Sequence, residues 1–152
     1  MNRSTDSAFA VAVAPFVDIA LSPEFAIGAS LQVIFRVRGD GSTGESAKEF
    51  DLRVRLTARK PMSPNVRVFG RLSPAYSSIS IPASPTGAPT IPDPQGFLVD
   101  FSVGTEVALL PNLFLVVDLG YQAGFQSSST SDGNSFNGTR YLHLGGGLAI
   151  GL

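Results

Sequence analysis

Residues 49–60 read EFDLRVRLTARK, and their side chains alternate between two kinds. Apolar side chains stand at Phe50, Leu52, Val54, Leu56 and Ala58, and polar or charged ones stand at Asp51, Arg53, Arg55, Thr57 and Arg59. Successive side chains of a β-strand point to opposite faces of the sheet. The stretch therefore predicts a strand with one apolar face and one ionic face. Because such apolar faces recur along the chain, the pattern is typical of a barrel with an apolar outside and a polar interior.

Seven segments alternate in this way, and they predict an all-β protein with a single domain over residues 8–152. They cover residues 8–21, 25–38, 49–60, 65–81, 96–109, 113–126 and 139–152. We expect an antiparallel up-and-down transmembrane β-barrel with seven strands visible of eight. Residues 1–7 are expected to be a polar tail or the remnant of an outer loop. In the fourth segment the second half, Ser73–Ser80, alternates less regularly than the first.

The composition narrows the classes of protein. Charged residues make up 15% of the 152 residues and the mean hydropathy is +0.21, yet no stretch approaches the roughly 20 apolar residues of a spanning helix. The 16 Gly and 11 Pro residues disfavour long helices. A net charge of −1 gives no indication of nucleic-acid binding, and a chain without Cys has no disulfide or thiolate metal site. We expect no cofactor.

The expected connections between strands alternate in length. Residues 22–24, 60–64 and 111–112 are short and contain Pro, whereas residues 39–48, 82–95 and 127–138 are long and rich in Gly, Ser, Thr and Pro. Bacterial membrane barrels have short turns on the periplasmic side and longer loops outside. Because all the long connections fall at one end of the predicted sheet, the pattern favours a barrel that displays three surface loops.

The chain resembles the small bacterial outer-membrane β-barrels of the OmpA and OmpX type over residues 8–152. The most specific part is the last segment, where apolar residues alternate up to the final position: Leu142, Leu144, Leu148, Ile150 and Leu152. This resembles the family's terminal signal for the barrel-assembly machinery, although the family usually ends in Phe. The resemblance implies an outer-membrane location, with membrane lipid and the assembly machinery as partners. Residues 1–7 contain no apolar export signal, so we expect a processed chain.

The number of segments is odd, although bacterial single-chain barrels have an even number of strands. If the last segment ends on the short-turn side, the first segment begins on the long-loop side. We expect that a strand preceded the first segment. Two alternatives remain open: a second copy supplies the strand through self-association at the unpaired edge, or seven strands close by themselves.

The inward face of the predicted barrel is rich in ions. It collects Asp18, Arg36, Arg38, Asp51, Arg53, Arg55, Arg59, Arg67, Arg71, Asp100, Glu106 and Asp118. Simple hairpin counting places Arg36 opposite Asp51, Arg38 opposite Glu49, and Arg53 opposite Arg71. We expect a network of Arg, Asp and Glu that plugs the interior, since the interior of an eight-stranded barrel is filled by side chains. The predicted role is a scaffold for surface loops and not a wide pore.

Two other functions are open to a chain with this pattern. Some small outer-membrane barrels modify lipid A with a His and a Ser or an acid, and His143 is the only His here. Hairpin counting places Gln122 opposite His143, and no Ser follows it closely, so we expect a hydrogen-bonded interior His and no enzyme. One His without Cys also makes a metal site improbable. The third interpretation, a soluble lipocalin-like carrier, requires an apolar interior and a polar outside.

Overall fold

The computed structural model describes residues 9–37, 48–80, 94–129, 135–137 and 140–150, and all of its regular elements are strands. They are β1 (Phe9–Val13), β2 (Phe16–Ala20), β3 (Phe25–Val37), β4 (Lys48–Ser63), β5 (Val66–Ser80), β6 (Gln95–Leu110), β7 (Leu113–Gly124), β8 (Ser127–Ser129), β9 (Ser135–Asn137) and β10 (Arg140–Ile150). None of the described residues forms a helix long and apolar enough to cross a membrane.

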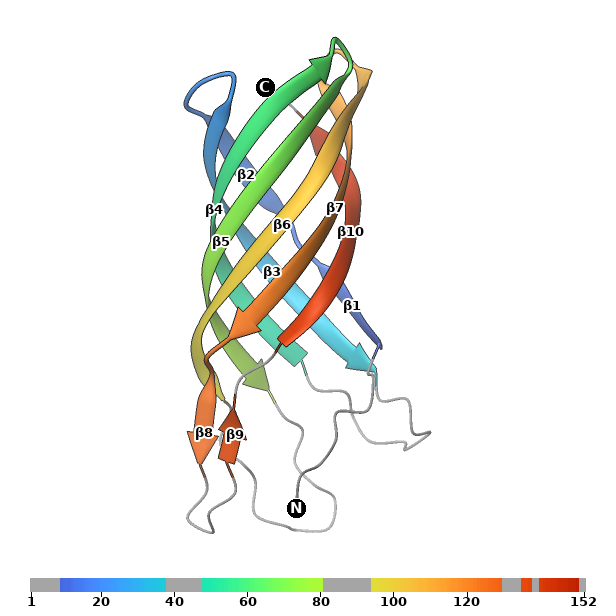
Figure 1. Ribbon diagram of the computed structural model, residues 1–152. Coiled ribbons are helices and arrows are strands. Elements are labelled where there is room, and N and C mark those ends of the chain that lie inside the picture. Colours follow the sequence, from blue (N-terminus) through green and yellow to red (C-terminus); the bar gives the residue numbers. More distant parts are fainter. Residues whose placement is uncertain (1–8, 38–47, 81–93, 130–134, 138–139, 151–152) are drawn as a thin grey trace.

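The strands form one antiparallel sheet that curls into a barrel-like wall (Figure 1). Its order is β1-β3-β4-β5-β6-β7-β10, so each strand of the wall pairs with the next one along the chain. This confirms the predicted all-β fold and the up-and-down order of its strands. The short turns lie at one end of the wall, which we call the turn end, and the opposite end is called the loop end.

The first predicted segment is split into two strands that act as one strand of the wall. Both β1 and β2 pair with β3, and the register runs through the break without a shift: Val13 lies opposite Val33 and Phe16 opposite Ser30. Pro15 lies in the break and has no N–H to donate to the ladder. Its carbonyl still accepts a hydrogen bond from the Leu31 N–H at 3.2 Å. The described wall therefore has seven strands, as the seven segments predicted.

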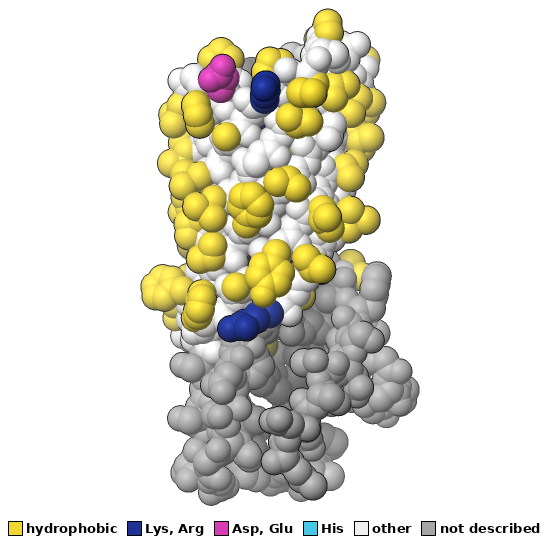
Figure 2. All heavy atoms as spheres, in the orientation of Figure 1, with side chains coloured by type: hydrophobic (Ala, Val, Ile, Leu, Met, Phe, Trp, Pro, Cys, Tyr) yellow, Lys and Arg dark blue, Asp and Glu magenta, His cyan; other side chains and the backbone are white. Residues whose placement is uncertain are grey.

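Side chains alternate across the wall as the sequence predicted. On β4, Asp51, Arg53, Arg55 and Thr57 are buried, whereas Leu52 between them is 64% exposed. Figure 2 shows the outer side of the wall, where apolar side chains are spread over the visible face and charged ones occur near its two ends. The interior of the sheet is thus polar and the outside is apolar.

The predicted extent of the fourth segment, residues 65–81, is confirmed by β5, whereas one prediction about strand extent was wrong. The second half of β5 is regular, because Ser73, Ala75, Ser77 and Ile79 are all buried while Tyr76 is exposed. Serine on both faces hid this alternation in the sequence. The stretch 127–138, expected to be a loop, contributes the short paired strands β8 and β9, which extend the sheet beyond β6 at the loop end.

The register between strands also differs from simple hairpin counting. Asp51 lies opposite Gln32 and not Arg36, and Glu49 lies opposite Ile34 and not Arg38. A similar correction applies to three other residues: Arg53 faces Ala75, Arg71 faces Thr57, and His143 faces Gly120. Counting assumes that paired strands end level with each other, whereas tilted strands of a barrel are staggered. For example, β3 continues beyond its last pair with β4, and its Arg36 pairs with Ala10 of β1.

Candidate functional site in the barrel interior

The interior side chains form two ionic clusters, one near each end of the wall. The loop-end cluster consists of Glu49, Asp51, Arg53, Ser77, Asp100, Gln122, Gln126 and His143. The turn-end cluster consists of Asp18, Arg55, Thr57, Arg59, Arg67, Arg71, Glu106 and Asp118. Nine of the predicted network residues and Arg59 are therefore in contact with an oppositely charged partner. The side chain of Arg36, and all of Arg38, lie outside the described residues.

Arg53 is the centre of the loop-end cluster. Its guanidinium lies 2.7 Å from the Asp51 carboxylate and 3.7 Å from that of Asp100. It also donates a hydrogen bond to Oε1 of Gln122. All these side chains are buried, and a guanidinium can satisfy several acceptors at once because its donors are arranged in a fixed fork.

Glu49 extends this cluster toward the loop end. Its side chain is completely buried, and its Oε1 accepts hydrogen bonds from Ser77 Oγ at 3.2 Å, Gln122 Nε2 at 3.3 Å and Gln126 Nε2 at 3.3 Å. Gln122 thus connects Glu49 to Arg53. Hairpin counting from the sequence placed Glu49 opposite Arg38, and the predicted network did not include Gln122 or Gln126. Their inward positions on the alternating pattern were the available signal.

The turn-end cluster pairs each guanidinium with a carboxylate. Arg59 bridges two acids, at 3.0 Å from Glu106 and 3.5 Å from Asp18. Asp18 also lies 3.3 Å from Arg55 Nε, and Glu106 lies 3.5 Å from Arg67. These contacts join β2, β4, β5 and β6 across the interior. Arg67 and Glu106 are direct partners on the neighbouring strands β5 and β6, whereas Arg59 contacts acids on strands that do not pair with β4.

Arg71 belongs to the same cluster and holds β5 to β7 through Asp118, at 3.0 Å. Aromatic rings add a second kind of contact, because the guanidinium of Arg71 lies 4.5 Å from the ring centre of Phe69. Arg55 lies 3.7 Å from the ring centre of Phe16 in the same way. Cations over aromatic faces are attracted by the ring quadrupole. The cluster is therefore packed as well as ion-paired.

Interior glycines make room for these side chains. A Cβ added at Gly145 would collide with the carboxylate of Asp118, and one at Gly120 would collide with the His143 ring. Gly145 on β10 therefore leaves the space that the Asp118 carboxylate occupies. At Gly147 a Cβ would meet nothing within 4 Å.

His143 has a different partner from the one that hairpin counting gave. Its Nε2 lies 2.6 Å from Asp100 Oδ2, across two strand interfaces, and not against Gln122. Ser102 follows on the same row, since it lies opposite Gly120, which in turn lies opposite His143. Ser102 is buried, however, and hydrolysis needs a nucleophile that substrate can reach together with oxyanion donors. The geometry supports a structural hydrogen bond between His143 and Asp100.

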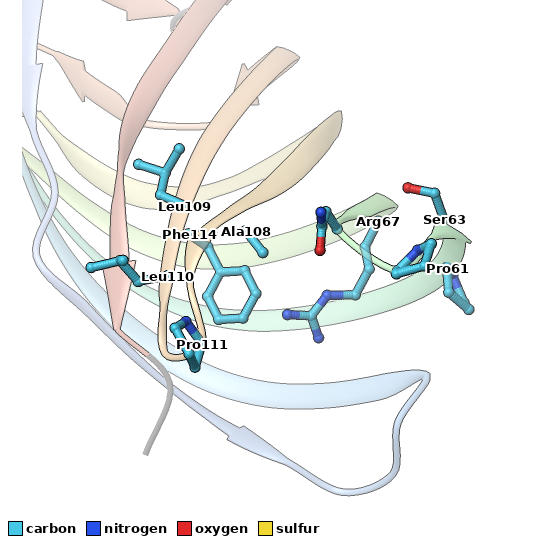
Figure 3. Close-up of a pocket in the computed structure, with 10 residues that line it drawn as sticks. Pro61, Ser63, Arg67, Ala108, Leu109, Leu110, Pro111 and Phe114 are labelled. Atoms are coloured by element: carbon cyan, nitrogen blue, oxygen red, sulfur yellow. The ribbon is translucent and has the colours of Figure 1, made fainter.

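The turn-end mouth of the interior contains a cavity of about 630 Å³. Figure 3 shows that Arg67 and Phe114 point toward each other across it, and the guanidinium lies 4.4 Å from the ring centre. Pro61 and Ser63 line one side of the cavity, and Pro111 lines the other. The partly exposed guanidinium of Arg67 next to the Phe114 ring does not indicate a particular ligand for this cavity. The described residues also contain no group of His, Cys, Asp and Glu suited to hold a metal ion.

The predicted assembly signal lies on β10. Leu142, Leu144, Leu148 and Ile150 are all exposed on the outer face, as expected, and Leu152 lies outside the described residues. Comparison with protein-family models and with curated proteins finds no match to this chain.

Proposed function

We propose that this chain is an integral β-barrel protein of a bacterial outer membrane, of the small OmpA and OmpX type, which acts as a scaffold for loops at one end. The proposal places the apolar outer wall against lipid and the ionic clusters inside. Membrane lipid and the barrel-assembly machinery would be its partners, the latter through the alternating apolar face of β10.

The outer face of β4 carries the proposal. Lys48 and Lys60 are both exposed on this face, at its two ends, and the outward residues between them are all apolar. These residues are Phe50, Leu52, Val54, Leu56 and Ala58. The lysines stand twelve positions apart on one strand. At about 3.3 Å per residue and a tilt of about 40°, they are separated by roughly 30 Å along the barrel axis. This separation matches the hydrocarbon thickness of a bilayer, about 30 Å.

The rest of the wall repeats this pattern. Outward-facing Phe97, Phe101, Leu119 and Tyr121 on β6 and β7 are exposed, and so are Leu142 and Leu144 on β10. Soluble monomers rarely expose continuous apolar patches larger than a few hundred square ångströms. An apolar surface over successive strands is therefore more favourable in lipid than in water.

The interior supports the scaffold in preference to a wide channel or a carrier. Glu49 of β4 and Gln122 of β7, which are three strands apart in the sheet order, lie 3.3 Å apart across the interior, so side chains occupy its cross-section. A lipocalin-like carrier needs an apolar interior for its ligand, whereas the described interior holds two ionic clusters. In the proposed scaffold, function is carried by the segments of sequence that join β3 to β4 and β5 to β6.

Refolding into lipid tests the proposal. The chain should gain strand circular dichroism and a compact, heat-sensitive gel band in vesicles or detergent, and it should not do so in water. A chain that folds as a monomer in plain buffer would contradict the membrane proposal and would favour the soluble lipocalin-like carrier.

A further inference from the structure

The outer face of the wall has a groove in its turn-end half. Ala58 of β4 and Gly70 of β5 lie directly opposite each other in the sheet, on a face where most outward positions carry large apolar side chains. Both residues line a cavity of about 500 Å³, a volume typical of small-molecule sites. Exposed apolar residues form its sides: Leu21, Phe25, Leu56, Leu72 and Phe101.

Gly70 has no steric reason to be glycine within the described wall. At the inward glycines Gly104 and Gly145 an added Cβ would collide with a neighbouring side chain, whereas at Gly70 it would meet nothing within 4 Å. Glycine weakens the interior of a strand, and it often marks a place where a ligand approaches the backbone. An empty groove would also leave its lining without dispersion contacts. The groove is therefore suited to an occupant from outside the chain.

The proposed function, on which this inference rests, places the groove in the turn-end leaflet of the membrane. Along β4, the groove residues Leu56 and Ala58 lie between Val54, midway along the apolar face, and Lys60 at its turn end. The natural occupant at this depth is an acyl chain. Lipid tails are as apolar as Leu, however, so the groove alone does not select one lipid over another. Selection requires contacts with the headgroup.

Two opposite charges lie at the turn-end side of the groove. Lys60 is exposed on the outer face of β4, and Glu24 is the only exposed acid among the described residues. The backbone of Glu24 is held beside β4, because its carbonyl accepts a hydrogen bond from the Arg59 N–H at 2.6 Å and its N–H donates to Ser22 Oγ at 3.2 Å. The next residue, Phe25, lines the groove. Figure 2 shows an acidic and a basic side chain in the same part of the turn end.

Neither charge is neutralised by the described part of the chain, where the ion pairs join interior residues and none includes Lys60 or Glu24. A lysine ammonium binds phosphate as a point charge. A carboxylate accepts hydrogen bonds from a primary ammonium, which has three N–H donors, whereas the quaternary ammonium of choline has none. Together the two side chains complement a headgroup with a phosphate and a primary amine.

We infer that the groove over Ala58 and Gly70 binds one phosphatidylethanolamine molecule of the turn-end leaflet. One of its acyl chains lies in the groove, its phosphate contacts Lys60, and its ammonium contacts Glu24. The wall thus has one selective lipid site, in addition to its general contact with the membrane.

Fluorescence quenching by brominated lipids tests the inference, because the chain has no Trp. Phe101→Trp places a single reporter at the groove, and Leu115→Trp places one on the outer face of β7, in the same half of the wall but outside the groove. The probes are phosphatidylethanolamine, phosphatidylcholine and diacylglycerol with the same brominated acyl chains, in unlabelled phosphatidylcholine vesicles. At residue 101 each successive lipid in this order should bind about fivefold more weakly. At residue 115 the three should quench equally.

Charge variants made together with Phe101→Trp separate the two headgroup contacts. Glu24→Gln should remove the preference for phosphatidylethanolamine over phosphatidylcholine and keep that for phosphatidylcholine over diacylglycerol. Lys60→Gln should do the reverse, because diacylglycerol lacks the phosphate. Lys48→Gln, at the other end of the same face, is the matched control and should leave both preferences unchanged.

Filling the groove should remove the selection altogether. Gly70→Leu should make the three lipids equal at residue 101, whereas the same substitution at Gly146, on the outer face of β10, should leave their order intact. If Gly70→Leu does not fold, the charge variants still decide the outcome.

Three results would overturn the inference while the proposed membrane location stands. They are equal quenching by all three lipids at residue 101, the same order at residue 115, and an order at residue 101 that neither charge variant changes. Tighter binding of brominated phosphatidylglycerol than of phosphatidylethanolamine would overturn the contact with Glu24. If no brominated lipid quenches either Trp, the chain is not in the bilayer and the proposed function fails first.

Discussion

The guanidinium of Arg53 lies 2.7 Å from the carboxylate of Asp51, two residues earlier on the same strand, and both side chains are buried. The second acid near Arg53 is Asp100, at 3.7 Å, on β6. Removing one partner of a buried ion pair leaves an uncompensated charge, which costs more than removing both. Arg53→Leu should therefore lower the free energy of unfolding by about 3–5 kcal/mol.

A double-mutant cycle measured by urea unfolding in vesicles checks this prediction. Asp51→Leu combined with Arg53→Leu should lose less stability than the sum of the two single variants, because the two residues interact directly. Additive losses, or a single-variant loss below about 0.5 kcal/mol, would show that the pair does not form in the folded protein.

His143 should contribute to stability and not to catalysis. His143→Ala removes the hydrogen bond to the buried Asp100 and leaves Arg53, at 3.7 Å, as its remaining ionic neighbour, so we expect a loss of about 1–3 kcal/mol in the free energy of unfolding. Replacing Asp100 by Asn in the same variant should recover part of that loss, because a neutral amide is cheaper to bury than a carboxylate that has lost a hydrogen bond.

A separate measurement tests the alternative that the protein is a lipid A-modifying enzyme that uses His143. Mass spectrometry of lipid A from cells that express the wild-type chain or His143→Ala should give identical spectra. A mass change that appears with the wild type and is lost in His143→Ala would assign a lipid-modifying activity to this interior.

Two glycines on β10 should respond differently to the same substitution. Gly145→Ala places a methyl group against Asp118 and displaces it from Arg71, which lies 3.0 Å away. Its expected cost is about 1–2 kcal/mol. Gly147→Ala has open space in this chain and should be neutral or slightly stabilising, because Ala loses less backbone entropy on folding. Equal effects of both substitutions on urea unfolding would contradict the described interior.

The outer face of β4 should show a depth-dependent penalty for charge. Val54 lies midway between Lys48 and Lys60. In vesicles, Val54→Arg should lower the free energy of unfolding by about 2–4 kcal/mol, whereas Ala58→Arg, near the turn end, should cost about 0–1 kcal/mol. In a water-soluble protein both positions are exposed surface, and both substitutions would be nearly neutral.

The two faces of each strand could be predicted from the sequence, but the network between strands could not. Period-two alternation places Arg53 inside and Val54 outside, whatever the neighbouring strand does. The hydrogen bond from Arg53 to Gln122 joins residues 69 positions apart, and it depends on strand stagger and on the curl of the sheet. Hairpin counting takes neither the stagger of the strands nor the curl of the sheet into account. It therefore placed Arg38 opposite Glu49, whereas Ile34 lies opposite Glu49 in the sheet.

Where side chains are small or polar on both faces, the sequence signal also weakens. Ser77 and Ser78 differ in burial because successive side chains point to opposite faces, but two serines give no sign of which face is inside. The short ladder between β8 and β9 consists mostly of serine and has no apolar face to reveal it. By contrast, Pro15 did not end the first strand of the wall, because the pairing with β3 continues in the same register on both sides of it.

The central claim is that the wall is apolar outside and ionic inside, the reverse of a water-soluble barrel. Spin labels on two adjacent residues of β5 test this claim most directly. Leu72 is exposed on the outer face and Ser73 is buried in the interior, so Leu72→Cys and Ser73→Cys form a matched pair in a chain without native Cys. In lipid vesicles, the label at residue 72 should collide with dissolved oxygen and be shielded from a water-soluble nickel complex, and the label at residue 73 should be shielded from oxygen. Strong collision of the nickel complex with the label at residue 72, in the folded protein, would contradict the membrane-facing wall.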